Sequence, residues 1–121
     1  MGAIQADITL EERLFIGEDR TINIDVNEAD GHTPQTMTGF ALTWELKDSI
    51  TGTVRVTKTV GSGITIGNGD GTDDRAAIAL ADTDTEGLTA GTLFHHLRRT
   101  DAGSELVLAF GNVILTNSGI T

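Results

Sequence analysis

Cysteine is absent from this 121-residue chain, and so is tyrosine. A chain without thiols forms no disulfide and offers no thiolate nucleophile and no cysteine ligand for zinc or an iron–sulfur cluster. No apolar run approaches the roughly 20 residues that span a bilayer, and residues 1–15 lack a basic segment followed by an apolar one. We therefore expect a soluble, unexported protein that folds without crosslinks.

Basic residues are also scarce. Eight lysines and arginines stand against 18 acidic residues, which gives a formal net charge of -10. Nucleic acids and anionic lipids are bound through cationic surfaces, so we expect neither a nucleic acid nor a membrane as a partner. The length corresponds to one domain with one core.

Sequence motifs of catalytic sites are missing as well. None of the four serines lies in a G-x-S-x-G turn, no H-E-x-x-H sequence occurs, and the glycine-rich stretch 61–71 has no P-loop lysine. We expect no enzyme activity and no cofactor.

What the chain does contain is strict alternation of apolar and polar residues, the period of a β-strand. The clearest case is 40–47, and 20–26 repeats the pattern. Shorter apolar runs follow at 54–56, 64–66 and 76–80, and a longer one covers 105–115. The alternation predicts a core centred on Trp44 and formed by Ile22, Ile24, Val26, Phe40, Leu42, Trp44 and Leu46.

Turn residues separate these runs at 28–31, 49–52, 67–74 and 100–103. The spacing predicts an all-β fold, an antiparallel two-sheet sandwich of immunoglobulin-like or jelly-roll-like type with about seven to eight strands. In 81–88 we expect one helical turn with Asp82 or Thr83 as N-cap. Gly111 suggests a bulge or bend in the last strand.

Two strands differ in how their edges are protected. The run 53–60 carries Arg55 and Lys58, which is typical of a free edge, whereas 105–115 has little charge. We expect the former at an edge of a sheet and the latter in the centre or in a subunit interface.

The order of these elements resembles the immunoglobulin-like β-sandwich modules of tailed-bacteriophage virion proteins. The segments that carry the resemblance are 15–31, 37–52, 56–66, 79–103 and 110–116. Matching positions include the Asp30-Gly31 turn, Gly39, Asp84-Thr85 and Gly91. Where that family usually has a tyrosine, this chain has the stretch 93–96, Leu-Phe-His-His.

The resemblance implies a non-enzymatic virion structural protein, assembled in the host cytoplasm. It favours a capsid decoration or cement protein that binds the major capsid protein and neighbouring copies, with a trimer as the favoured oligomer. A tail, baseplate or head–tail adaptor is the alternative. A calcium- or glycan-binding sandwich module is a further one.

Within this interpretation, residues 1–13 form an N-terminal arm and 14–121 form the sandwich domain. Ile4, Ile8 and Leu10 are the candidate anchors of the arm on a neighbour. Arg98 and Arg99 are further interface candidates, because they offset the acidic surface or pair across a subunit contact.

Two chemical alternatives stay open. His95 and His96 are adjacent on an expected strand, so they point to opposite faces and do not chelate one metal together. We expect one ring to lie inward and one outward, with a metal ligand or a pH switch as the other possibility.

The acidic loop is the second alternative. It offers weak calcium candidates, namely Asn68, Asp70, Asp73 and Asp74. The EF-hand pattern fails, because the sixth position from Asn68 is Asp73 and the twelfth is Ala79. A solvated turn with no metal is therefore our expectation for this loop.

Overall fold

The structure of the chain is a computed structural model, which describes residues 8–9, 12–27, 33–67 and 73–117. The described residues form β-strands and one short helix, so the all-β class is confirmed. The strands are β1 (Ile8–Thr9), β2 (Glu12–Phe15), β3 (Arg20–Asp25), β4 (Leu42–Lys47), β5 (Val54–Val60), β6 (Gly63–Ile66), β7 (Arg75–Leu80), β8 (Gly91–Arg99) and β9 (Leu106–Thr116).

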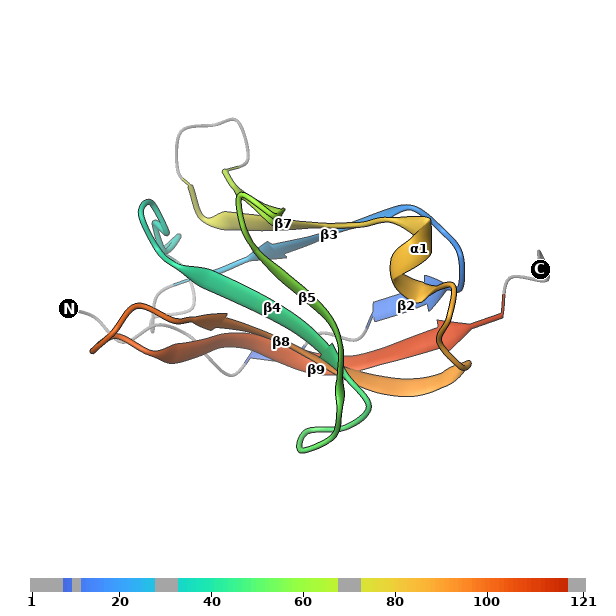
Figure 1. The fold of residues 1–121 in the computed structure, drawn as a ribbon. Helices are drawn as coiled ribbons and strands as arrows, with labels where there is room; N and C mark the ends of the chain where they lie inside the picture. Colours follow the sequence, from blue (N-terminus) through green and yellow to red (C-terminus); the bar gives the residue numbers. More distant parts are fainter. Residues whose placement is uncertain (1–7, 10–11, 28–32, 68–72, 118–121) are drawn as a thin grey trace.

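Hydrogen bonds connect all these strands into one sheet in the order β1-β9-β8-β4-β5-β6-β7-β3, and β2 also pairs with β9. The pairs are antiparallel except for β1 and β2 with β9, and β5 with β6. β8 and β9 lie in one layer, β3 and β7 in another, and β4 and β5 cross in front of them (Figure 1). The sheet curls into a nearly closed barrel, so two separate sheets are not confirmed.

The interior of this curled sheet is filled by alternate residues of the strands. Ile22 and Ile24 of β3 and Leu42, Trp44 and Leu46 of β4 are all at most 2 % exposed. Burying a tryptophan removes about 150–250 Å² from water, which at about 25 cal/mol per Å² stabilises the fold by roughly 4–6 kcal/mol. Trp44 therefore contributes more apolar burial than any other core side chain.

The two remaining residues predicted for the core, Val26 and Phe40, also contribute to it. Val26 is fully buried, and Phe40 is half-buried and packs against the core from its edge. The core extends further into β7 and β9 through Ile78, Leu108 and Val113.

One expectation about the strands is wrong, and another is right except for its position. β5 is not an edge strand, because it lies between β4 and β6, and Lys58 is held by Asp84 at 2.8 Å rather than left in solvent. β9 does carry a bulge, but at Leu108 instead of Gly111, because Leu97 pairs with Ala109 and Arg98 with Val107. The other expectation about β9 is confirmed, since it lies inside the sheet.

The helix α1 (Asp82–Thr85) is one turn long, and among the described residues no helix has the length and apolar character needed to cross a membrane. Its N-cap is Ala81, so the prediction of Asp82 or Thr83 is wrong by one or two positions. The capping contact comes instead from Asp84, whose carboxylate accepts a hydrogen bond from the Ala81 N–H at 2.7 Å.

Part of the segment predicted as an arm belongs to the sheet. β1 pairs with β9 at Ile8↔Ala109, and β2 does so from Glu12↔Val113 onward. The boundary between arm and domain at residue 13 stays a prediction.

Candidate functional site

The adjacent histidines of β8 lie on opposite faces of the curled sheet, because successive residues of a strand alternate. His95 is 0 % exposed on the inside, where its Nδ1 accepts a hydrogen bond from Trp44 Nε1 at 3.0 Å. A nitrogen that accepts from an indole N–H carries no proton, so this ring is neutral and its proton is on Nε2. The inner histidine is thus part of a buried polar pair.

His96 lies on the outside of the same strand. Its Nε2 is 2.7 Å from Oε1 of Glu45, which stands opposite it on β4. Its ring meets Phe94 edge-on, with centroids 6.2 Å apart, and Phe94 in turn lies 6.3 Å from Phe110 of β9. Two phenylalanine side chains and the hydrogen-bonded pair of His96 and Glu45 therefore share the outer face of β4, β8 and β9.

Beside these aromatic rings the surface contains a hollow of about 420 Å³. The wall of the hollow comes from β8, β9 and the turn between β4 and β5. Its lining residues are Asp48, Ser49, Ile50, Thr92, Leu93, Phe94, Phe110, Gly111 and Asn112. Most of them are apolar or small, and we call this feature the outer hollow.

The turn that joins β4 to β5 extends away from the two layers (Figure 1). Its conformation is fixed by two hydrogen bonds from Arg55 to Asp48, at 2.8 and 2.7 Å, and by a bond from Lys47 Nζ to the carbonyl of Ile50. The hydrogen bonds from Arg55 lower the pKa of the Asp48 carboxyl below its ordinary value. At the tip, Ile50 is 68 % exposed, which is the largest exposure among the large apolar residues described.

Exposed isoleucine on a fixed turn next to an apolar hollow is typical of a protein-contact surface. The sequence reasoning did not identify Ile50, Phe94 or Phe110 as such. The available signal was an isoleucine placed between Ser49 and Thr51 in a turn, where polar residues are usual.

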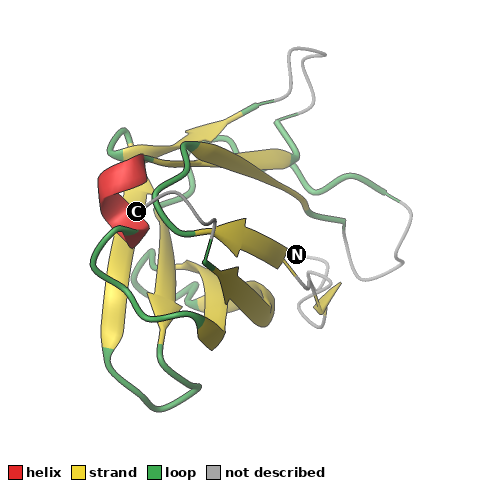
Figure 2. Cartoon of the chain, turned by 90° about the vertical axis from the view of Figure 1, so that its right-hand side faces the viewer, coloured by secondary structure: helices red, strands yellow, loops and turns green. Residues whose placement is uncertain are grey.

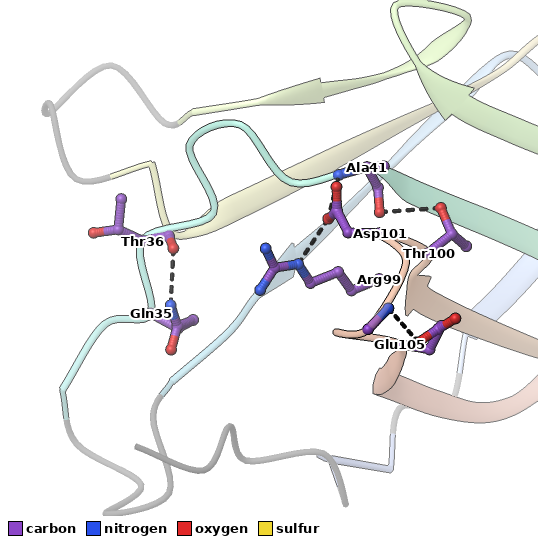
Figure 3. A network of polar contacts seen from close by, with 8 residues as sticks. Gln35, Thr36, Ala41, Arg99, Thr100, Asp101 and Glu105 are labelled. Carbon is purple, nitrogen blue, oxygen red and sulfur yellow. Dashed lines mark hydrogen bonds and ion pairs between the residues drawn. The ribbon is translucent and has the colours of Figure 1, made fainter. Parts of the chain in front are cut away.

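The predicted interface arginines have different surroundings. Arg99 is engaged within its own chain: its Nε donates to Asp101 at 2.7 Å, and its guanidinium lies 3.7 Å from the centre of the Phe40 ring. Asp101 also accepts from the N–H of Ala41 (Figure 3), so it links the end of β8 to the start of β4. The hydrogen bond from Arg99, followed by that from Ala41, lowers the pKa of Asp101.

Arg98 is exposed, and it lines another hollow of about 450 Å³ together with Arg99, Glu105, Leu106 and Val107. The structure thus leaves Arg98 on the surface, where it stays an interface candidate.

Of the predicted arm anchors, Ile4 and Leu10 lie outside the described residues. Ile8 is in β1, beside Ala109. Their role on a neighbouring subunit stays a prediction.

The calcium candidates are only partly described. Asn68 and Asp70 lie outside the described residues. Asp73 has a positive φ of 52° and accepts a hydrogen bond from Thr38 Oγ1 at 2.7 Å. The carbonyl of Asp74 accepts from the Val26 N–H, which ties the end of this loop to the chain after β3. Within the ranges that the structure describes, no group of three or more acidic or histidine side chains is arranged for a metal ion.

No model of a known protein family matches the sequence, and no curated protein matches it.

Proposed function

We propose that this chain is a non-enzymatic structural protein of a tailed-bacteriophage virion, and that it acts by binding other protein subunits. The observation that carries the proposal is the outer hollow with the exposed Ile50 beside it, because such a surface is built to bury apolar side chains of another protein. The resemblance of the segment order to phage sandwich modules is the second ground for the proposal. Of the virion roles, a capsid decoration or cement protein is the one we put forward.

The finer fold assignment belongs to the same proposal. The two layers visible from the end of the molecule (Figure 2) are interpreted as the two sheets of an immunoglobulin-like or jelly-roll-like sandwich. They are joined where β5 meets β6, and that parallel pair has only two registered positions, Thr59↔Gly63 and Val60↔Ile64. A junction this short is compatible with two sheets that touch at one corner.

The surface chemistry also suits a protein present in many copies. A net charge of -10 opposes nonspecific association of the subunits, while a specific contact made through apolar side chains can still form. The predicted partners are the major capsid protein and neighbouring copies of the chain.

Immunogold labelling of intact phage particles tests the proposal. Antibodies raised against the purified chain are applied to particles of the phage that encodes it, and gold positions are recorded by electron microscopy. Labelling over the head supports a decoration protein. Labelling confined to the tail or neck replaces that role with an adaptor, and particles that contain no copy of the chain by mass spectrometry refute the proposal.

A further inference from the structure

We infer that the hollow at the start of β9 is a docking site for residues 4–7 of this same chain, which extend β1 along the edge of β9. We call it the β9-edge hollow. Its volume is about 450 Å³, and its lining residues are Arg98, Arg99, Glu105, Leu106 and Val107. The inference names the surface and its occupant, and it holds whether or not the chain is a virion protein.

The first argument is an open edge of the sheet at this place. β9 begins at Leu106, but its parallel partners β1 and β2 pair with it only from Ala109 and Val113 onward. On that side of β9, no described strand pairs with residues 106–108. Val107 is 38 % exposed there, whereas Leu106 packs partly against the core. An edge whose backbone groups lack a partner favours the addition of another strand.

The second argument is the direction of the chain. β1 runs parallel to β9, with Ile8 beside Ala109 and Thr9 beside Phe110. Paired strands rise by the same amount per residue, about 3.3 Å. A strand that continues backward from Ile8 in this direction therefore passes residues 106–108 one after another. Three residues of chain, about 10 Å at this rise, cover the open edge.

The third argument is the sequence of the segment. Ile4 and Ala6 are apolar and alternate with two polar residues, and β1 continues the same period at 8–9. A period of two is typical of a β-strand that turns one face toward an apolar surface. No proline interrupts the segment, so every residue keeps the N–H that strand pairing uses. The pattern therefore suits an edge lined by Leu106 and Val107.

The covalent connection to β1 selects this segment over a separate partner. A segment attached through a short connection is present at an effective concentration on the order of mM. A free polypeptide at micromolar concentration must bind about a thousandfold more tightly to displace it. The same comparison applies to residues 4–7 of a second copy, so the contact within one chain is favoured.

Disulfide crosslinking in the full chain tests the inference, because the natural sequence has no cysteine to interfere. A disulfide requires Cα atoms about 4.4–6.8 Å apart. We expect Ala6→Cys with Val107→Cys to form a disulfide within one chain under mild oxidation, measured by mass spectrometry. The matched control combines Ala6→Cys with Val60→Cys, since Val60 is similarly exposed at 44 % but lies in β5, which β8 and β4 separate from β9. It should crosslink at least about tenfold more slowly.

A scan of the first cysteine through positions 4–7 separates a docked strand from a segment that is merely attached nearby. In a docked strand, side chains alternate between the faces, and only one or two positions lie within the disulfide distance of Val107→Cys. Crosslinking rates should therefore differ by about tenfold or more between neighbouring positions. An undocked segment should give rates that change little along the scan.

Amide hydrogen exchange of the natural chain, measured by NMR, is a second readout that needs no substitution. Amides of residues 4–7 should exchange at least about tenfold more slowly in the chain than in a synthetic peptide of residues 1–9, because paired backbone groups open only rarely. This measurement keeps the inference testable if a cysteine variant fails to fold, which thermal melting detects.

Equal crosslinking rates at positions 4–7, or amides that exchange as in the free peptide, would overturn the inference. Disulfide-linked dimers in place of monomers would also overturn it, because they assign the β9-edge hollow to the segment of a neighbouring copy. These outcomes are separate from the proposed function. A chain whose segment does not dock and which still labels phage heads refutes the docking alone, and a docked chain that is missing from every particle refutes the virion role alone.

Discussion

The inner and outer faces of β4 and β8 are built from neighbouring residues of the same two strands, yet they differ in every contact. Inside, Trp44 and His95 share a hydrogen bond of 3.0 Å at 0 % exposure. Outside, Glu45 and His96 are joined at 2.7 Å but remain partly exposed, next to Phe94 and the outer hollow.

The position of each histidine in the strand period therefore decides its role, since the two residues are of the same type. The inner pair is shielded from water, so loss of either partner leaves a buried polar group unpaired. The outer pair keeps some contact with water, since its side chains are 13 % and 24 % exposed, and we expect it to contribute less to stability than the inner pair. Mutations on the two faces should therefore separate folding from binding.

The largest effect is expected at Trp44. Trp44→Ala leaves a cavity at the centre of the core and should lower the free energy of unfolding by about 3–5 kcal/mol. Urea denaturation followed by circular dichroism measures the loss. Ile50→Ala, on the exposed turn, serves as the control and should stay within about 0.5 kcal/mol of the natural chain. A Trp44→Ala loss as small as that of Ile50→Ala would contradict the central position of the indole.

The buried hydrogen bond comes next. His95→Leu removes the acceptor of the Trp44 N–H and should cost about 1–3 kcal/mol of stability. In a double-mutant cycle, Trp44→Phe should be less costly in the His95→Leu background than in the natural chain, because the donor is then already without its acceptor. Strictly additive losses would show that the two rings are not coupled.

The outer pair should matter less. Glu45→Gln keeps the size of the side chain and removes its charge, and we expect a loss of about 0–1 kcal/mol, measured by the same denaturation. If Glu45→Gln proves as damaging as His95→Leu, the division between the two faces does not hold.

The smallest effect concerns the link between β8 and β4. The pKa of Asp101 is lowered by its hydrogen bonds from Arg99 and then from the Ala41 N–H. A lowered folded-state pKa stabilises the fold above the ordinary value of about 3.9 and loses that contribution as pH falls through the folded value. Asp101→Asn should therefore destabilise the chain at pH 7, and thermal melts should show the gap closing below about pH 4. A gap that is independent of pH would rule out the ionised carboxylate as its cause.

Alternation was enough to predict the all-β class and the inward side chains of β3 and β4, because burial of every second residue is a local property of a strand. It was enough as well to separate the two histidines of β8. Alternation could not predict the order of the strands. β5 carries Arg55 and Lys58 but lies inside the sheet, and the partner of Lys58 is Asp84, which is distant in the sequence.

The same limit applies to the candidate site. The outer hollow combines residues of β8 and β9 with the β4–β5 turn, and no sequence spacing shows that Ile50 and Phe110 line one surface. Likewise, the sequence does not show that Arg99 donates a hydrogen bond to Asp101 and packs against the Phe40 ring.

Long-range ¹H–¹⁵N spectra of the His95 and His96 rings, recorded over a concentration series, test whether the inner face holds the fold and the outer face binds a partner. We expect His95 to keep an unprotonated Nδ1 and unchanged signals at every concentration, while the signals of His96, beside the outer hollow, move as copies associate. A protonated Nδ1 on His95, or signals of His95 that move while those of His96 stay fixed, would contradict it.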